Sequence, residues 1–377
     1  MLFFSTKLRN IMQAFHNINN NMKDLLAGLL AISMTLISVT ASAMSSPWSI
    51  TSEQELTTRY EREIKSFWQT GQFSQFSGVD DINIRYAQFV SPNRDKCLVL
   101  VPGRSEGYLK YQELAFDLTN AGYNLFIIDH RGQGLSGRMQ ADQHKGYVAM
   151  FDHYSDDLHY FVSNIVQTQC QQNIYLLAHS MGGAISARYM QRYQTPIKAA
   201  VLASPMIAIN SGGIPNWLGE FIISGGDTLS KWLSDDSWYF LGQDGYSSRP
   251  FADNALMQSP VRYEIFTNLY QSTPELQLGG VTFRWLDEAV KANKDIFADV
   301  NKLTTPTLVL QAGSDTVVDN SAQDDFCRAL HAAHPQSCPN GKPEVITGAR
   351  HEIFFELDEY RVDGIVKTLN WFEQTGN

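Results

Sequence analysis

The chain has 377 residues, of which 44% are hydrophobic and 18% charged, a composition that supports a packed core and excludes wholesale disorder. Its formal net charge is -10 and no run of lysines and arginines occurs, so we expect no nucleic acid partner. This length suits one large domain or two small ones.

The first 43 residues are typical of a targeting segment. Lys7, Arg9 and Lys23 precede an uncharged stretch over 25–44, whose apolar part LLAGLLAISMTLISV is followed by Ala-Ser-Ala at 41–43. A basic start, an apolar run and small residues define a secretory signal, which predicts a periplasmic or secreted protein. Such a stretch is also long enough to cross a bilayer as a helix, so the alternative is an uncleaved anchor at the inner membrane.

After the leader, residues 44–80 form an N-terminal extension, of which 51–75 is polar and helix-like. From residue 81 onward, short β-rich runs such as CLVLVPG, NLFIIDHRG and IYLLAHSMGG alternate with segments of helical period. Continuous apolar strands separated by amphipathic helices predict an α/β domain over 81–377, with a mostly parallel central sheet and helices on both faces.

The alternation stops over about 206–287. Aromatic and aliphatic clusters, among them Trp217 and Phe221, are interrupted there by glycines and prolines. We interpret this stretch as a helical cap inserted over the edge of the sheet. The strand–helix pattern returns with TPTLVLQAGSD and PEVITGARHE, and an amphipathic helix ends the chain.

Four cysteines are present, and an even number in an exported chain permits two disulfides. Cys327 and Cys338 are close in sequence, which favours a local bridge, and Cys97 and Cys170 are the other candidates. Four buried free thiols are the alternative. No Cys/His spacing suggests a zinc site, and nothing in the sequence calls for a metal or an organic cofactor.

The segment Ala-His-Ser-Met-Gly at 178–182 lies between an expected strand and an expected helix. A serine at the apex of such a sharp turn is the nucleophile elbow, whose usual pattern is G-x-S-x-G. Ala178 stands in place of the first glycine, which its small size makes tolerable. Ser180 is therefore the predicted nucleophile, whereas the neighbouring His179 points away from it and packs beneath the turn.

A serine hydrolase needs two N–H groups for the oxyanion. One is expected from Met181, the residue after the nucleophile, and the other from the loop after the strand at 97–101. Gly103 permits a close approach in that loop, which makes the N–H of Arg104 the candidate.

In this arrangement an acid and then a histidine follow the serine along the chain. Asp315 comes directly after the strand at 307–311 and is the predicted acid, with Asp319 and Asp324 as competitors. His351 follows a short strand and is the predicted base. His331 and His334 fall in a helix and at its polar end, which indicates surface positions.

These motifs resemble the monoglyceride-lipase group of α/β-hydrolases, and most closely the bacterial lysophospholipases of that group, with a serine aminopeptidase S33-type domain. The likeness rests on VPGRSEGYLKYQELAFDLTNAGYNLFIIDHRGQGLSGR, LLAHSMGGAISARYM, LVLQAGSDTVVDN and TGARHEIFFE. It implies a Ser180–Asp315–His351 triad and a helical cap, with His130 in a structural loop. The chain departs from the pattern of the group in two places. It has Pro102-Gly103-Arg104 in the oxyanion loop, where monoglyceride lipases usually have His-Gly, and it has an N-terminal leader, which the lysophospholipases of the group generally lack.

The expected activity is hydrolysis of the single acyl ester of a lysophospholipid or a monoacylglycerol. Trp217 and Phe221 of the cap would line the acyl site, and the cap would touch the membrane. Burial of the acyl chain is worth about 0.8 kcal/mol per methylene. Arg104 or Arg138 would pair with the phosphate of a lysophospholipid.

Two other functions are open. The first is an aminopeptidase of proline-iminopeptidase type, which needs cap carboxylates to hold a free amino terminus. Candidates for those carboxylates are Glu220, Asp227, Asp235 and Asp236. The second is a non-enzymatic lipid-binding protein that has the hydrolase fold and an inactive site.

Overall fold

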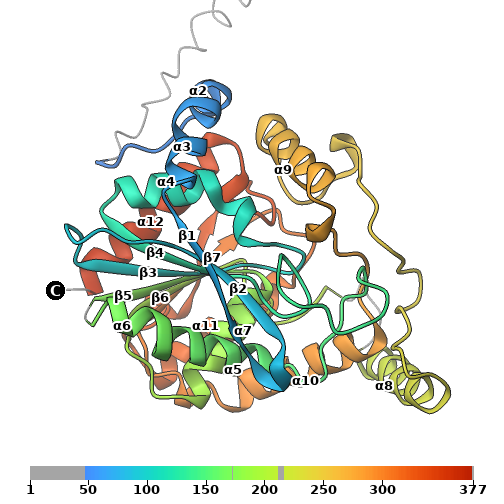
Figure 1. The fold of residues 1–377 in the computed structure, drawn as a ribbon. Coiled ribbons are helices and arrows are strands. Elements are labelled where there is room, and N and C mark those ends of the chain that lie inside the picture. Colours follow the sequence, from blue (N-terminus) through green and yellow to red (C-terminus); the bar gives the residue numbers. More distant parts are fainter. Residues whose placement is uncertain (1–46, 172, 211–215, 376–377) are drawn as a thin grey trace, which may run out of the picture. The chain divides into compact units, whose positions relative to one another are not determined.

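The computed structural model describes residues 47–171, 173–210 and 216–375, and its centre is an eight-stranded sheet in the order β1-β2-β4-β3-β5-β6-β7-β8 (Figure 1). The strands are β1 (Gln72–Ser77), β2 (Asn83–Phe89), β3 (Lys96–Val101), β4 (Tyr123–Ile128), β5 (Ile174–His179), β6 (Ile197–Ala203), β7 (Thr307–Ala312) and β8 (Glu344–Ile346). β4, β3, β5, β6, β7 and β8 are parallel, and β1 and β2 pair antiparallel at one edge.

Helices cover both faces of this sheet, and others lie in the segment between β6 and β7. In chain order they are α2 (Glu53–Arg59), α3 (Lys65–Trp68), α4 (Gln112–Asn120), α5 (Asp152–Phe161), α6 (Gln167–Gln169), α7 (Met181–Arg192), α8 (Asn216–Leu233), α9 (Pro260–Ser272), α10 (Phe283–Ala298), α11 (Asn320–Ala333) and α12 (Asp358–Thr375). α4 and α12 pack on one face, and α5, α7 and α11 on the other, each group around its own hydrophobic cluster. The predicted α/β architecture with a mostly parallel sheet is confirmed.

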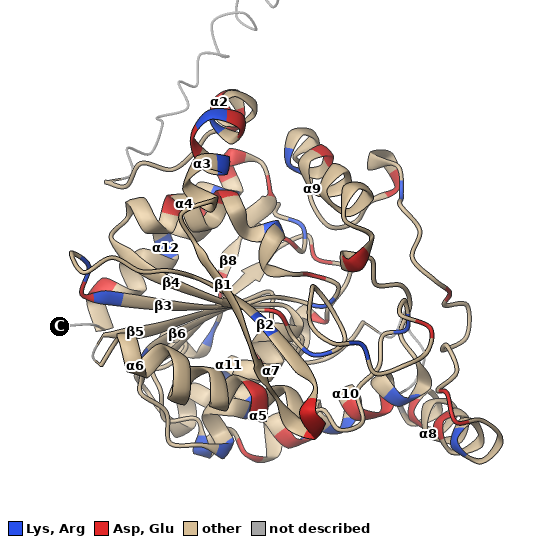
Figure 2. Ribbon diagram, viewed as in Figure 1, with Lys and Arg blue, Asp and Glu red and all other residues tan. Residues whose placement is uncertain are grey.

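The composition of the strands explains this layering. Every residue of β4, β5 and β7 is buried, as expected for strands covered on both faces. Figure 2 shows the charged residues mainly on the surrounding helices and loops, whereas the middle of the sheet is nearly free of them.

One expectation about the N-terminal extension is wrong. A helix is predicted over 51–75, but the helical part of this stretch ends with α3. Residues 72–77 form β1 instead, so the sheet begins before residue 81. The phenylalanines of β1 are three residues apart, a spacing that suits a helix, and only Phe76 is buried. Pairing with β2 along this edge therefore decides the conformation, rather than the hydrophobic period.

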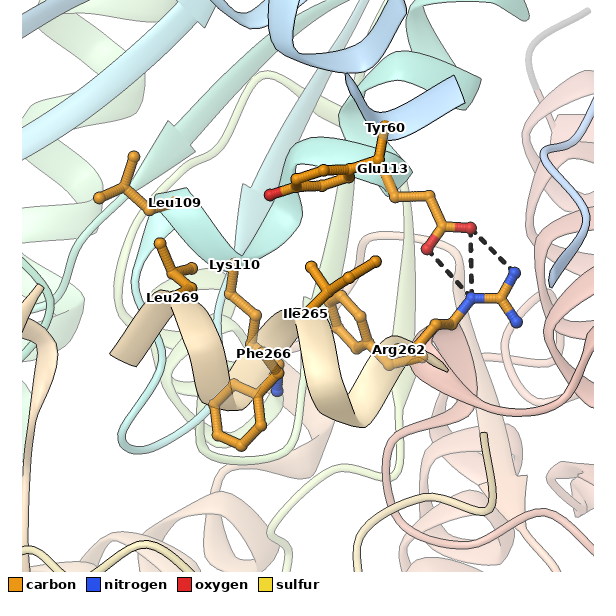
Figure 3. A pocket seen from close by; sticks show the side chains of 9 residues that line it. Tyr60, Leu109, Lys110, Glu113, Arg262, Ile265, Phe266 and Leu269 are labelled. Carbon is orange, nitrogen blue, oxygen red and sulfur yellow. Dashed lines mark hydrogen bonds and ion pairs between the residues drawn. The ribbon is translucent and has the colours of Figure 1, made fainter. Parts of the chain in front are cut away.

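The segment between β6 and β7 contains α8, α9 and α10, and the boundary expected at about 287 falls inside α10. α9 is fastened to the body of the protein through Arg262. Its guanidinium donates to both carboxylate oxygens of Glu113 in α4, at 2.9 to 3.2 Å (Figure 3). Beside this ion pair, Ile265 and Leu269 of α9 point toward α4 and the turn before it. The cavity left between them measures only about 20 Å³, room for one water molecule and not for a substrate.

Two disulfides link parts of the domain. Cys97 at the start of β3 is bonded to Cys170, and Cys327 of α11 is bonded to Cys338. The predicted signal or anchor lies outside the described residues. Among the helices that the structure does describe, none is both long and apolar enough to span a bilayer.

Candidate active site

Ser180 occupies the sharp turn between β5 and α7. Its backbone has φ 53° and ψ -118°, a sparsely populated conformation for a residue with a side chain. The turn is held on both sides, because the N–H of Ser180 donates to Ala203 and its carbonyl accepts from Met206. Gly182 is required next to it, since a Cβ there would lie 2.2 Å from the carbonyl oxygen of Val101. The structure thus has the strained elbow geometry expected from the sequence.

The three predicted catalytic side chains lie in one line. His351 Nε2 is 2.9 Å from Ser180 Oγ, and His351 Nδ1 is 2.7 Å from Asp315 Oδ2. Serine, imidazole and carboxylate in this order can pass the serine proton to the imidazole and stabilise the imidazolium that forms. His351 and Ser180 are buried, so this interaction is largely shielded from water.

The environment of Asp315 keeps it ionised. Burial alone would raise the pKa of this carboxyl group. Hydrogen bonds from His351 and from the N–H groups of Val317 and Val318, together with the charge of His351, hold it below the ordinary value.

The competing acids and histidines have other partners. Asp319 caps α11 by accepting the N–H of Ser321 at 2.8 Å, and Asp324 accepts from the side chain of Gln311. His331 and His334 bond to backbone carbonyl groups remote from the elbow. Only Asp315, of the three aspartates considered, reaches His351.

Two N–H groups beside Ser180 are candidates for an oxyanion hole. The N–H of Gly103 donates to Glu106 Oε2 and is therefore occupied. The N–H groups of Arg104 and Met181 have no acceptor among the described residues, and Met181 is the first residue of α7. A helix N-terminus adds a partial positive charge there, which favours a developing anion.

A buried network beneath the site was not anticipated from the sequence. Glu106 Oε2 accepts from the hydroxyl of Tyr111 at 2.7 Å and lies 3.2 Å from Nδ1 of His179, while Oε1 accepts from Lys110 at 2.6 Å. Lys110 also donates to Glu352 at 2.6 Å. The spacing of Glu106 and Lys110, four residues apart, is the only local signal, and it is common on solvated surfaces.

His179 connects this network to the base. Its Nε2 lies 3.2 Å from the carbonyl oxygen of His351, while Nδ1 faces Glu106. Both neighbours are acceptors, so only the doubly protonated imidazolium donates to both. Burial lowers the pKa of His179, but the charge and hydrogen bond of Glu106 outweigh burial and raise it above the ordinary value.

An apolar cavity of about 400 Å³ lies beside the segment that follows β6. It begins at Ile207, next to the residue whose N–H donates to Ser180. The hydrophobic side chains that line it are Ile207, Ala208, Ile209, Ile223, Phe240, Leu286, Val290 and Phe297. The lining comes from the segment after β6, from α8 and α10, and from Phe240 between these two helices.

Trp217 and Phe221 do not belong to this lining, and their contact with the acyl chain stays a prediction. Their exposed fractions are 71% and 74%, and they lie on the outer face of α8. The helix turns Gly219, Glu220 and Ile223 toward the cavity instead. Apolar residues occur on both faces of α8, so the sequence did not distinguish the inner face from the outer one.

The two candidate arginines differ in their surroundings. Arg138 donates to the carbonyl groups of Ser136, Gln143 and Glu275, and these bonds engage its guanidinium. Arg104 lines a second, more polar cavity of about 450 Å³. No cluster of histidine, cysteine, aspartate or glutamate suited to a metal ion occurs within the described part of the chain.

The parallel sheet with an antiparallel edge, the serine elbow after β5 and the helical insertion after β6 define an α/β-hydrolase. The chain belongs to the serine aminopeptidase S33 family, whose model matches residues 92–358.

Individual relatives agree with this assignment. The chain is 38% identical to lysophospholipase L2 of Escherichia coli K12, over 82% of this chain and 90% of that protein. It is 31% identical to a probable lysophospholipase L2 of Haemophilus influenzae, over 82% and 94%. The solved structure of a monoglyceride lipase from Saccharomyces cerevisiae has the same fold, with a TM-score of 0.62 and 20% identity over 81% of this chain and 94% of that chain. The family resemblance expected from the motifs is confirmed.

Proposed function

We propose that this carboxylic ester hydrolase removes the single acyl chain of a lysophospholipid or a monoacylglycerol, with Ser180 as the nucleophile. The observation that carries the proposal is the line from Ser180 through His351 to Asp315 beside an apolar cavity. The similarity to lysophospholipase L2 proteins supports a lipid substrate and favours the lysophospholipid.

The reaction proceeds in two halves. Ser180 Oγ attacks the ester carbonyl carbon while His351 takes the hydroxyl proton, and the N–H groups of Met181 and Arg104 stabilise the oxyanion. Collapse of the tetrahedral intermediate expels the glycerol-bearing alcohol, which takes the proton from His351. Water then attacks the acyl-enzyme by the same route and releases the fatty acid and free Ser180. Asp315 orients His351 throughout.

The apolar cavity is the proposed acyl site. A long chain that leaves water gains about 0.8 kcal/mol per methylene, so the acyl part dominates binding. Ile207 of its lining follows Met206, whose N–H donates to the carbonyl of Ser180, and this neighbourhood supports a carboxyl end of the chain placed at Ser180.

An aminopeptidase activity is the second candidate, because the family model carries that description. It would need a cap carboxylate that is available to an amino terminus. Three of the four candidate acids are already paired: Glu220 with Lys294, Asp227 with Arg284 and Lys231, and Asp236 with Lys145. These pairs favour the ester hydrolase.

A panel of lysophosphatidylethanolamine, monoacylglycerol and an aminoacyl anilide tests the proposal, with Ser180→Ala as the control. We expect fatty acid release from the lipids, loss of this release in Ser180→Ala, and Ser180-dependent labelling by a fluorophosphonate. Turnover of the anilide alone would support the aminopeptidase. No turnover and no labelling would support the non-enzymatic lipid-binding protein.

We further propose that the outer face of α8 contacts a lipid surface. Its most exposed large side chains are Trp217, Phe221 and Trp232, the last with an exposed fraction of 81%. Tryptophan is suited to a membrane interface, and a net charge of -10 leaves apolar insertion as the attractive force. Substitution of Trp217 and Trp232 by serine should reduce the fraction of protein that sediments with phosphatidylethanolamine vesicles. The same variant should still cleave a monomeric short-chain ester. Unchanged sedimentation would contradict this contact.

The compartment is also a proposal. Two disulfides and the predicted leader support a periplasmic or secreted protein, because such bonds persist in oxidising compartments. N-terminal sequencing of the protein isolated from cell fractions tests it. A start near residue 44 in the periplasm is the expected result, and an intact leader in the membrane fraction would favour the anchor.

A further inference from the structure

Arg104 is a cation without a carboxylate partner. Its guanidinium donates to the carbonyl of Gly279 and to the hydroxyl of Ser105, and it lies 5.4 Å from the centre of the Trp285 ring. Its Nε is buried and has no hydrogen-bond partner. No carboxylate of the described residues lies within ion-pair distance. Burial therefore lowers the pKa of Arg104 to about 10.

The fully buried cations of the described residues all contact carboxylates: Lys110 with Glu106 and Glu352, Arg131 with Asp157, Arg188 with Asp152 and Asp299, Arg262 with Glu113, and Arg361 with Asp117. Arg104 is partly buried and, like Arg85, Arg138 and Arg350, forms no ion pair with a described carboxylate, but it is the one of these four that lines the polar cavity. A desolvated cation is costly unless it is paired. An anionic ligand would supply for Arg104 the charge that the protein supplies for the others.

The cavity beside Arg104 is suited to a polar anion. It measures about 450 Å³ and lies between the loop that follows β3, the segment 242–249 and α9. Besides Arg104, the uncharged polar and cationic side chains that line it are Ser105, Gln243, Tyr246, Ser247, Ser248, Arg249, Asn254, Tyr263 and Thr267. The one carboxylate in the lining, Asp244, is exposed and accepts the N–H of Gly245. Arg249 is exposed and adds a second cation.

The same cavity reaches the catalytic loops. Arg104 follows Gly103, where an added Cβ would lie 3.1 Å from Ser180 Cβ. On another side the lining includes Val317, whose N–H donates to Asp315. The polar cavity is thus lined by neighbours of the oxyanion loop and of Asp315, and the apolar cavity by Ile207, the neighbour of Met206. In a lysophospholipid the phosphate is separated from the acyl ester only by the glycerol backbone, so it has to bind close to the elbow.

We propose that this polar cavity is the headgroup site and that the side chain of Arg104 binds the phosphate of a lysophospholipid, with Arg249 at its rim. The inference rests on the proposed function, and it selects lysophospholipids over monoacylglycerols. It also selects Arg104 over Arg138, whose guanidinium is already engaged by three carbonyl groups.

The test compares two substrates with the same acyl chain, lysophosphatidylethanolamine and monoacylglycerol, in the full chain. The quantity measured is the ratio of their kcat/KM values, because any general disturbance of the oxyanion loop cancels in it. A charged hydrogen bond to the phosphate predicts that Arg104→Gln lowers this ratio about 30-fold. Arg104→Lys, which keeps the charge without the planar fork, should recover part of the loss.

Two control variants test whether the loss of any arginine would change this ratio. Arg138→Gln should leave the ratio within about twofold of wild type, since Arg138 does not line the cavity. Arg328→Gln, on the exposed surface with an exposed fraction of 71%, should do the same. An unchanged ratio in Arg104→Gln, or an equal fall in Arg138→Gln, would overturn the inference.

Competition on the wild-type protein provides a measurement that does not depend on the folding of a variant. Glycerophosphoethanolamine should compete with lysophosphatidylethanolamine, whereas inorganic phosphate at equal concentration should not. Absence of competition by glycerophosphoethanolamine, or equal competition by inorganic phosphate, would remove the headgroup assignment. Failure of the wild type to cleave lysophosphatidylethanolamine at all would instead refute the proposed function.

Discussion

Glu106 and His179 form a buried pair, with 3.2 Å between Oε2 and Nδ1, and this pair links three loops of the candidate site. Glu106 accepts the N–H of Gly103 in the oxyanion loop, and His179 precedes the nucleophile on the elbow. His179 also faces the carbonyl of His351, the proposed base. One carboxylate thus positions the donor loop, the elbow and the base loop relative to one another.

This relationship predicts a change in the titration of His179. In the variant Glu106→Gln burial and the charge of Lys110 still lower the pKa of His179. The larger charge that raises it is gone and only Glu352 remains, so the pKa should fall below the ordinary value of an imidazole. In the wild type the pKa is raised, so the pair contributes its full stability below the pKa of the unfolded imidazole. It loses that contribution as pH rises through the folded pKa.

Proton-detected NMR of the imidazoles and urea unfolding at several pH values measure both effects. Glu106→Gln should lack the wild-type loss of stability at alkaline pH. The matched control is Glu63→Gln, which removes an exposed carboxylate paired with Arg59 and should change neither quantity. A His179 pKa that does not move in Glu106→Gln would contradict the proposed coupling.

A second prediction separates Asp315 from Asp319. Asp315→Asn removes the charge opposite His351 and should reduce kcat for ester hydrolysis about 10⁴-fold, as expected when the orienting acid of such a triad is neutralised. Asp319→Asn should leave kcat unchanged, because asparagine also caps a helix. Steady-state kinetics on a soluble ester compares the two. A larger loss in Asp319→Asn would transfer the role of the acid to that residue.

The elbow provides a third prediction. A Cβ at Gly182 would lie 2.2 Å from the carbonyl oxygen of Val101 and 2.4 Å from that of Pro102, so Gly182→Ala should destabilise the protein by about 3 kcal/mol. Gly225→Ala in α8 is the matched control, since a Cβ there has no neighbour within 4 Å. It should stabilise the fold by up to about 1 kcal/mol. Urea unfolding checks both, and equal effects would refute the argument from close approach.

The disulfides provide a fourth prediction. Cys97 and Cys170 are 73 residues apart, and Cys327 and Cys338 are 11 apart. Because a crosslink restricts the unfolded chain more when it closes a longer loop, replacing the first pair by serine should cost about 4 kcal/mol. Replacing the second should cost about 3 kcal/mol. The free energy of unfolding in urea, with and without a reducing agent, decides whether this order holds.

The fold was largely predictable because its determinants are local. Each buried strand is a short apolar run, and each covering helix has a clear period, so the order of elements follows from the sequence. The carboxyl ends of parallel strands meet at one edge of a sheet, which is why Ser180, Asp315 and His351 could be placed together from the sequence.

The features that could not be predicted depend on distant partners. Glu106 contacts His179, 73 residues away, and nothing in the local sequence indicates that this glutamate is buried. β1 has no strand-like alternation and exists because β2 offers it an edge. The inner face of α8 is set by its contact with α10, while both of its faces carry apolar residues.

The anchoring of α9 through Arg262 has a consequence for the N-terminal end of the domain. Besides Glu113, this guanidinium contacts Asp358 of α12, and Ser259, the residue that caps α9, donates to Glu53 at 2.6 Å. The N–H of Glu53 in turn donates to Asp358 at 2.8 Å. A helix that walls the polar cavity is thereby tied to residues near the beginning of the folded domain. Trimming of the protein past Glu53 would remove the partner of Ser259 at the start of α9, while Arg262 would keep Glu113 and Asp358. The N-terminal end of the domain thus helps to fix one end of the helix that walls the polar cavity, from a position outside that cavity.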